Sequence, residues 1–270
     1  MGSENIGFIG VGNMGKALLR GIIGSGLVSV NRVFASDLNR SKLENLAEDL
    51  SITAVKDNKD LVHKSDIIIL AIKPNVIKAV MSEISAYIKQ PKWLISIAAG
   101  IKTDFIESFL QKETPVVRVM PNTPAMVNAG MSALCAGSNA SHKHLDKASQ
   151  LLQAVGKVVI VEEKLMDAVT ALSGSGPAFV FLIIEAFTDA GVKLGLSYSD
   201  AATMAIQTIF GASKIAMDTG EHPAILKNKV TSPGGTTAAG LYQLERNAVR
   251  SAFIDAISSA AARAKELSSD

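Results

Sequence analysis

The sequence predicts an α/β protein with two parts: an N-terminal doubly wound Rossmann-type domain, followed by an all-α C-terminal domain. Up to Glu162, short apolar segments alternate with amphipathic helical patterns, which is typical of a parallel sheet covered by helices on both faces. A glycine-rich G-x-G-x-x-G segment at 10–15 follows the first apolar segment. From Lys164 onward only long helical patterns are found. We therefore expect domains at 1–162 and 163–270.

The strands expected in the first domain are apolar runs that a buried parallel sheet requires. They lie at 6–9, 32–35, 67–70, 93–96 and 116–119. Helical patterns separate them at 16–23, 41–50 and 76–88. Two further strands at 131–136 and 158–161, with a helix at 142–154 between them, are expected to complete the sheet.

The second domain is expected to consist of helices that one chain alone cannot cover. They are predicted at 166–172, 177–194, 199–219 and 238–266, the last with a possible break near Asn247. The helix at 177–194 is apolar around much of its circumference, so it needs burial on all sides. A domain of this size supplies few covering layers. We expect a second copy of the chain to cover it, and a compact monomeric bundle is the alternative.

Composition excludes several classes of function. The net charge is +2 and no run of five like charges occurs, which disfavours a nucleic acid or membrane surface as partner. The longest uninterrupted apolar runs, 67–72 and 178–184, are shorter than the ~20 residues of a membrane span. The single cysteine, Cys135, suits a small buried side chain in a reducing compartment, so we expect a cytoplasmic protein. The four histidines lack metal-ligand spacing, and no metal site is expected.

The glycine segment 10–15 predicts a dinucleotide site because it follows a strand and opens a helix. Gly10 permits a tight turn, Gly12 lets the backbone approach a pyrophosphate, and Gly15 lets helix and strand pack closely. The N-terminus of the helix offers free N–H groups to the phosphates. A glycine-rich turn without a ligand is the alternative.

The residues after the second strand give conflicting signals about the cofactor. Asp37 stands where an acid usually bonds the ribose of NAD. Asn39, Arg40 and Lys42 follow it and are able to hold the extra phosphate of NADP, although they also suit a solvated helix start. NADH and NADPH both stay open, with a slight preference for NADPH.

Two further loops follow parallel strands, at 71–74 and 98–100. Ligands bind at such carboxyl ends. Lys73 is either a catalytic base or a structural or cofactor-facing residue, and the rigid turn at Pro74 favours the latter interpretation.

Two segments of the second domain resemble the signature segments of pyrroline-5-carboxylate reductases. They are Leu172–Ala178 (LSGSGPA) and Val230–Thr237 (VTSPGGTT). Asp189–Leu196 (DAGVKLGL) and Met120–Pro124 (MPNTP) also match, and the resemblance runs from Ile6 to Leu267. It implies reduction of 1-pyrroline-5-carboxylate to L-proline with NADPH or NADH, the last step of proline biosynthesis. It also implies a homodimer interlocked through the helical domain and assembled into a larger ring such as a decamer.

The resemblance and the glycine motif together imply a set of site residues. Those expected around the cofactor are Ile9, Gly10, Val11, Gly12, Asn13, Met14, Ser36, Asn39, Arg40, Asn58, Ala71, Ile72, Lys73, Pro74, Ala98, Ala99, Gly100, Met120, Pro121 and Asn122. Those expected at the substrate are Ser175, Ser232, Gly234, Gly235, Thr236 and Thr237. Thr237 is the expected catalytic residue, as a hydrogen-bond partner of the ring nitrogen.

The reaction asks little of the side chains. The cofactor carries the hydride chemistry, and an imine nitrogen can arrive protonated from solution. The protein has to bind the small carboxylate of the substrate. The segment 232–237 precedes a predicted helix whose backbone N–H groups can converge on an anion. Ser173–Pro177 is similar, although either segment alone also reads as an ordinary helix start.

Two other functions fit parts of the sequence less well. A β-hydroxyacid dehydrogenase shares the glycine motif, but that family places a lysine in the helix after its second glycine-rich segment, and 177–182 contains none. A redox-sensing regulator would bind the dinucleotide without turnover, and the two intact signature segments argue against it.

Overall fold

The structure, a computed structural model, describes residues 4–268. These residues form two compact units. One contains the described chain up to Ser175 and from Ala260 onward, and the other is Gly176–Ser259. The division differs from the boundary predicted after Glu162, since Met166 is fully buried against Ala133 and Cys135 of the sheet. The predicted domain boundary stays a prediction.

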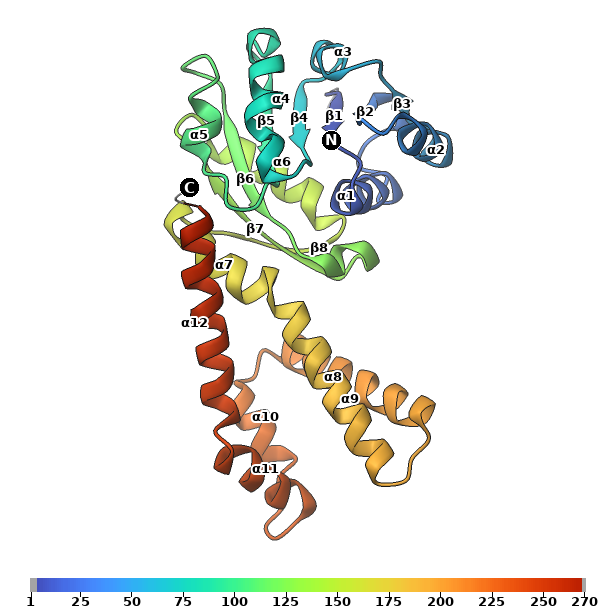
Figure 1. Ribbon diagram of the computed structural model, residues 1–270, viewed down its shortest axis with the longest axis vertical. Coiled ribbons are helices and arrows are strands. Elements are labelled where there is room, and N and C mark those ends of the chain that lie inside the picture. Colours follow the sequence, from blue (N-terminus) through green and yellow to red (C-terminus); the bar gives the residue numbers. More distant parts are fainter. Residues whose placement is uncertain (1–3, 269–270) are drawn as a thin grey trace. The chain divides into compact units, whose positions relative to one another are not determined.

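The first unit is built on one eight-stranded sheet in the order β3-β2-β1-β4-β5-β6-β7-β8 (Figure 1). The strands are β1 (Ile6–Ile9), β2 (Val33–Ser36), β3 (Thr53–Ala54), β4 (Ile67–Leu70), β5 (Trp93–Ser96), β6 (Val116–Met120), β7 (Gly130–Ala136) and β8 (Gly156–Ile160). In this order, all neighbouring strands from β3 through β2, β1, β4 and β5 to β6 are parallel. Strand β7 is antiparallel to β6, and β8 is parallel to β7. The predicted Rossmann-type architecture is confirmed. The two-residue strand β3 and the reversal at β7 are additions to it.

Alternate residues of the strands supply two separate cores, one on each face of the sheet. In β4, Ile67 and Ile69 enter one core while Ile68 and Leu70 enter the other. The first core is covered by α1 (Asn13–Gly24), α2 (Arg40–Leu50) and α6 (His142–Gln153), and the second by α3 (Asn58–Lys64), α4 (Ile77–Ile84) and α5 (Thr103–Glu107). Both faces of each central strand are therefore buried, which explains their continuous apolar sequences.

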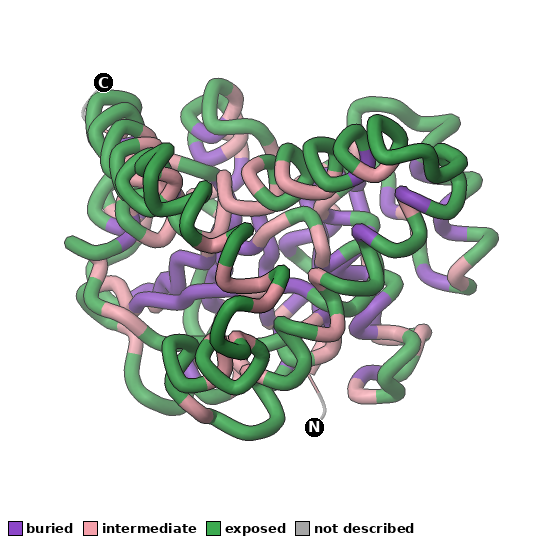
Figure 2. The backbone as a smooth tube through the Cα atoms, turned by 90° about the horizontal axis from the view of Figure 1, so that it is seen from below, coloured by how far each residue is buried: buried purple, intermediate pink, exposed green. Residues whose placement is uncertain are grey.

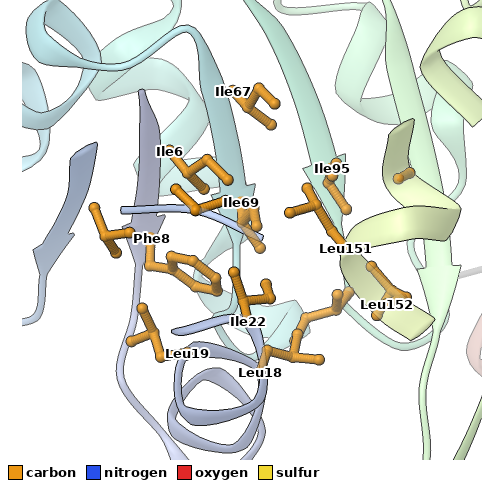
Figure 3. Close-up of a cluster of buried hydrophobic side chains, with 14 of the residues drawn as sticks. Ile6, Phe8, Leu18, Leu19, Ile22, Ile67, Ile69, Ile95, Leu151 and Leu152 are labelled. Carbon is orange, nitrogen blue, oxygen red and sulfur yellow. The ribbon is translucent and has the colours of Figure 1, made fainter. Parts of the chain in front are cut away.

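Helix α1 brings its apolar stripe onto the sheet and so fixes the glycine loop before it. Leu18, Leu19 and Ile22 are at most 1% exposed and pack near Phe8 of β1 (Figure 3). Each such side chain stabilises the fold by about 1.5–3 kcal/mol when fully buried. The position of the loop at 10–12 thus follows from the packing of the helix that it opens.

A close contact of two glycines joins β7 to β8. Gly156 has a φ of 149°, and a Cβ atom there would lie 1.9 Å from the carbonyl oxygen of Gly130. The Gly130 amide donates to the Val155 carbonyl oxygen at 2.8 Å. Only glycine allows the two backbones to pass at this distance.

The second unit consists of helices. They are α8 (Gly176–Lys193), α9 (Tyr198–Thr219), α10 (Pro223–Lys229), α11 (Thr236–Arg246) and most of α12 (Val249–Leu267). α8 follows α7 (Met166–Val169) and a π-helical turn at Thr170–Gly174. The predicted break near Asn247 is confirmed, with Ala248 in the left-handed region at φ 53°.

Most residues of the helical unit are exposed in the single chain, whereas every residue of the central strands β1, β4 and β5 is buried. Figure 2 colours the backbone by this burial. Phe181, Leu182 and Phe210 are 58–63% exposed. Exposed apolar side chains on this scale are typical of a surface that a partner covers.

One helical stretch, Glu163–Lys193, is long and apolar enough to cross a membrane, with a mean hydropathy of 1.5 over its most apolar window. The uninterrupted apolar run at 178–184 underestimated the length of this apolar stretch, because a continuous helix tolerates a few polar residues among the apolar ones. Length and composition alone are weak evidence for a membrane span. An exposed apolar helix is also typical of a dimer interface.

Candidate active site

The loops after β1, β4, β5 and β6 meet at the carboxyl edge of the sheet around a cavity of about 320 Å³. It is lined by Gly12, Asn13, Met14, Ala71, Ile72, Lys73, Pro74, Ile97, Ala99, Met120 and Pro121. All of these except Ile97 are residues predicted at the cofactor. Ile97 was missed because its apolar side chain at a strand end is indistinguishable from a core residue in the sequence. Its position at this edge is where ligands bind in open parallel sheets.

The glycine loop leaves the start of α1 open to an anion. Gly10 has a φ of 97°, and a Cβ atom there would lie 2.5 Å from the Ala71 carbonyl oxygen. At Gly12, a Cβ atom would meet nothing within 4 Å. Gly12 caps α1 without a side-chain hydrogen bond, and no acidic residue occupies the first turn. The free N–H groups and the helix dipole therefore suit the pyrophosphate of a dinucleotide.

Asp37 ties the loops after β1 and β2 together. Its Oδ2 accepts a hydrogen bond from the Val11 amide at 2.7 Å, and its Oδ1 accepts one from the Asn39 amide at 2.8 Å. The carboxylate expected to bond the ribose thus has a backbone partner on each oxygen. Its first role is to hold the glycine loop in place.

Two of the three residues after Asp37 that were predicted to hold the NADP phosphate, Asn39 and Arg40, have protein partners. Asn39 Oδ1 accepts from the Lys42 amide at 3.0 Å and caps α2. Arg40 donates from Nε to Glu44 Oε1 at 2.8 Å and from Nη1 to the Val55 carbonyl oxygen at 2.6 Å. The guanidinium of Arg40 is therefore directed to protein groups.

Ser36 and Asn58, far apart in the sequence, are brought into contact. Ser36 Oγ donates to Asn58 Oδ1 at 2.8 Å, and Asn58 Nδ2 donates to Glu83 Oε2 at 2.9 Å. The Ser36 carbonyl oxygen accepts from the Gly10 amide at 2.8 Å, which places this chain of hydrogen bonds beside the glycine loop. Glu83, on α4, had no motif that marked it in the sequence.

The remaining predicted cofactor residues lie around this region without lining the cavity. Ile9, Val11 and Ala98 are buried in the hydrophobic cores. Gly100 (φ 75°) lies against the Leu267 carbonyl oxygen, 3.4 Å from a Cβ atom placed there. Asn122 Nδ2 donates to the Ser173 carbonyl oxygen at 3.0 Å, and its Oδ1 accepts from the Met131 amide at 2.8 Å. Asn122 therefore links β7 to the first signature segment.

The first signature segment, Leu172–Ala178, begins inside the π-helical turn at Thr170–Gly174, and such turns are frequent at functional sites. A Cβ atom at Gly174 would lie 2.7 Å from Met120 Cε, so the absent side chain makes room for a residue that lines the cavity. The Ser175 hydroxyl, expected at the substrate, donates to the Thr170 carbonyl oxygen at 3.3 Å. It keeps only acceptor capacity for a ligand.

The second signature segment makes a tight turn in the helical unit and then opens α11. Gly234 has a φ of 69°, and the Gly235 amide donates to the Ser232 carbonyl oxygen at 3.1 Å. Gly235 caps α11 without a side-chain hydrogen bond, and the first turn contains no acidic residue. The N–H groups at Thr236 and Thr237 are thus the first donors of an uncapped helix.

A partly buried ion pair lies on the sheet where the long helical stretch begins. Arg118 of β6 is 4% exposed, and its Nη1 lies 3.1 Å from Glu163 Oε1. The amide and hydroxyl of Thr103 donate to the same carboxylate at 2.8 and 2.7 Å. Burial acts most strongly and raises the pKa of Glu163, but the bonds from Thr103 and Arg118 together outweigh it, so the pKa is lowered. No motif in the sequence marks Arg118 or Glu163 as partners.

Among residues 4–268, no group of three or more His, Cys, Asp or Glu side chains is placed to hold a metal ion.

Comparisons with known proteins agree over nearly the whole chain. Residues 163–267 match the family model for pyrroline-5-carboxylate reductase dimerisation, and 5–100 match that for NADP oxidoreductase, coenzyme F420-dependent. A pyrroline-5-carboxylate reductase of Methanosarcina acetivorans is 46% identical, with 99% of each chain covered. The structure of one from Coxiella burnetii has a TM-score of 0.94 at 38% identity, with 99% of each chain covered. That of the Plasmodium falciparum pyrroline carboxylate reductase, with NADP bound, has a TM-score of 0.88 at 32% identity, again covering 99% of each.

Proposed function

This chain belongs to the pyrroline-5-carboxylate reductase family, and we propose that it reduces 1-pyrroline-5-carboxylate to L-proline with a hydride from NADPH or NADH. The observation that supports binding of the cofactor is the N-terminus of α1. It has no side-chain cap, the space around Gly12 is open, and it lies at the edge of the cavity between the loops after β1, β4, β5 and β6. When bound, the dihydronicotinamide supplies the hydride. The reaction belongs to proline biosynthesis, as its last step.

The residues around the cavity divide the binding of the cofactor between them. The loop at Gly10–Met14 offers backbone N–H groups to the pyrophosphate. Ser36 and Asn58 lie beside it and bind the adenosine ribose or its phosphate. Met120 and Pro121, backed by Gly174, bound the nicotinamide end of the cavity. This division follows the order of the loops along the carboxyl edge of the sheet.

The segment Ser232–Thr237 grips the carboxylate of the imine. The first N–H groups of α11 have no side-chain cap, and the left-handed Gly234 turns the chain so that they are exposed together. An anion there gains hydrogen bonds and a favourable helix dipole. The Thr237 hydroxyl stands at the same helix start and can accept a hydrogen bond from the protonated ring nitrogen. We assign it the role of orienting the imine.

The proton balance needs no dedicated acid. The imine nitrogen is protonated in solution, the hydride is delivered to the adjacent carbon, and the product amine keeps the proton. Within residues 4–268, the cavity at the carboxyl edge is lined by one titratable side chain, Lys73, which is exposed at its mouth. The protein contributes positioning and the exclusion of water.

The helical unit supports a homodimer, and we propose that dimers assemble further into a ring such as a decamer. The dimerisation model covers 163–267, and the apolar side chains of α8 and α9 are exposed in one chain. Sedimentation equilibrium measures the mass of the assembly directly. We also propose a cytoplasmic location, which suits the buried unpaired Cys135, and cell fractionation tests it.

The decisive experiment mixes the purified protein with pyrroline-5-carboxylate and either NADPH or NADH. Oxidation of the cofactor with formation of proline is the expected result. If the protein binds the dinucleotide but oxidises neither form in the presence of the imine, it is a sensor of the cofactor and the proposal is wrong.

A further inference from the structure

Asn122 follows strand β6, and its side chain continues the pairing of that strand with β7. In the ladder Met120 lies opposite Ala133, so the same register places residue 122 opposite Met131. At this point the backbone has left the strand and enters the short turn Thr123–Val127. The Met131 amide donates to Asn122 Oδ1 at 2.8 Å. The side chain thus takes the place that a backbone carbonyl would have in a longer ladder.

The other end of the Asn122 amide meets a carbonyl that lacks its usual helical donor. The Ser173 carbonyl oxygen belongs to the π-helical turn at Thr170–Gly174. In an α-helix its partner would be the amide four residues on, but that residue is Pro177, which has no N–H. Asn122 Nδ2 donates to this oxygen at 3.0 Å. The asparagine of one motif therefore supplies a donor that the proline of another removes.

The two contacts leave the Asn122 amide one orientation. A backbone N–H only donates and a carbonyl oxygen only accepts, so Oδ1 has to face Met131 and Nδ2 has to face Ser173. Rotation of the amide would bring two donors together at one end and two acceptors at the other. Asn122 is half-buried, so both contacts are partly shielded from water. The side chain is consequently a rigid link between β7 and the π-helical turn.

This link fixes the position of one wall of the cavity. Met120 and Pro121, the two residues before Asn122, line the cavity at the carboxyl edge of the sheet. Gly174 follows Ser173, and a Cβ atom at Gly174 would lie 2.7 Å from Met120 Cε. The Met120 side chain therefore lies directly against the π-helical turn. A shift of that turn relative to β6 would move the Met120 side chain into or out of the cavity.

We propose that Asn122 is a positioning residue for hydride transfer: it holds the Met120 wall against the π-helical turn and thereby sets how the nicotinamide ring lies at that wall. The Asn122 amide is engaged at both ends, so it acts through Met120 and not as a ligand of the cofactor. The inference rests on the proposed function, because that function places the nicotinamide at the Met120 end of the cavity.

The test measures kcat and KM in the wild type and N122D, with the preferred cofactor and with the same cofactor deuterated at C4. N122D keeps the size of the side chain and still accepts from Met131, but a carboxylate has no N–H for Ser173. We expect kcat to fall about tenfold or more, because a displaced ring lengthens the path of the hydride. KM for the cofactor should stay within about twofold of the wild type. The isotope effect on kcat should rise as hydride transfer becomes slower than product release.

N139D is the matched control. Asn139 Nδ2 also donates to a backbone carbonyl oxygen, that of Lys112, at 2.7 Å. Residue 112 precedes β6 and residue 139 follows β7, so the pair lies at the edge of the sheet opposite the cavity. N139D should keep the kcat and the isotope effect of the wild type. If N122D raises KM for the cofactor and leaves kcat unchanged, Asn122 is a ligand of the cofactor and the proposal is overturned. Wild-type values of both constants in N122D overturn it as well.

Gly174→Ala disturbs the same wall from the other side and stays informative if N122D does not fold. The added methyl group meets the end of a flexible side chain, that of Met120, which can move aside. We expect kcat to fall about threefold or more with a larger isotope effect. Gly24→Ala, where a Cβ atom meets nothing within 4 Å, should have no effect. An unchanged kcat in Gly174→Ala overturns the role given to Met120.

The fluorescence of the bound dihydronicotinamide gives a readout without turnover. Its emission depends on the surroundings of the ring, so we expect a shifted emission maximum in N122D in the absence of imine. ADP-ribose, which lacks the nicotinamide, should bind N122D with the affinity of the wild type. If the wild type fails to reduce the imine but the shift is seen, the proposed function fails and the inference about Asn122 stands. An active wild type with no shift in N122D overturns the inference alone.

Discussion

Glu163 joins three parts of the first unit through one carboxylate: β6 by Arg118, α5 by Thr103, and the helical stretch that Glu163 itself begins. Arg118 is buried, and Glu163 compensates its positive charge. Removal of one member of such a pair leaves an uncompensated charge, which costs more than the pair contributes. The start of the long helix is therefore fixed electrostatically.

We expect E163Q to lower the free energy of unfolding at neutral pH by about 1–3 kcal/mol. The pKa of Glu163 is lowered in the folded protein from 4.5. Its contribution is therefore present above that value and is lost as the pH falls through the folded-state pKa. The difference between wild type and E163Q should shrink on acidification, in denaturant titrations at pH 7 and near pH 4.

The control for E163Q is its neighbour. Glu162 pairs with Lys164, but both side chains are more than 70% exposed, and such pairs contribute little. E162Q should leave stability unchanged at either pH. Equal effects of the two substitutions would contradict the role given to Glu163.

Thr237→Val tests the substrate segment with an almost isosteric change. Loss of the hydroxyl should lower kcat/KM for the imine about tenfold, because one hydrogen bond to the ring is lost. Binding of the dinucleotide, followed by fluorescence, should stay at the wild-type value. Thr53→Val, at an exposed residue of β3, is the matched control, and equal rates for Thr237→Val and wild type would remove Thr237 from the site.

At the scale of elements, long or strongly apolar segments were predictable and short ones were not. Residues 6–9, 67–70 and 93–96 are strands with the predicted bounds, because buried parallel strands need continuous apolar sequence. β3 has two residues, and α3, α5 and α10 have seven or fewer. Such elements are held by caps and tertiary contacts, as with Asp57 at the start of α3, and leave no periodic pattern.

The loops that line the site were predictable from the sequence, but the hydrogen-bond partners of the site residues were not. The glycine motif and the strand ends marked most residues of the cavity, because they depend on local sequence. The contacts of Asn58 with Glu83 and of Asn122 with Ser173 join residues 25 and 51 positions apart. Such contacts depend on how helices pack, which one sequence does not reveal.

Gly156→Ala tests the contact between β7 and β8. A Cβ atom there meets backbone, which has no freedom to move aside as a flexible side chain would. We expect a loss of about 3 kcal/mol or more in the free energy of unfolding, from strain and displaced pairing. Thermal and denaturant unfolding measure it. Gly24→Ala, at the end of α1 where a Cβ atom meets nothing within 4 Å, should be neutral or slightly stabilising. A neutral Gly156→Ala would contradict the contact.

At the scale of the whole molecule, the exposed apolar helices predict that stability depends on assembly. Phe181→Glu introduces a charge at a side chain of α8 that is 63% exposed in one chain. In a dimer that covers α8 the charge would be buried, so we expect a smaller mass by light scattering and a lower Tm.

Leu38→Glu provides the comparison, because Leu38 is 99% exposed and lies in the first unit. It should leave the mass unchanged. A Phe181→Glu protein with the mass of the wild type would show that α8 is not the covered face.

The first unit is interrupted in the sequence. The chain leaves it at Ser175 and rejoins it at Ala260, where Ala264 is 8% exposed and Leu267 lies against Gly100. The part that completes this unit therefore leaves the ribosome only after the helical segment has been made. Folding during synthesis is consequently not a matter of one unit after the other: the unit that contains the sheet reaches its final form only after the helical unit has been translated.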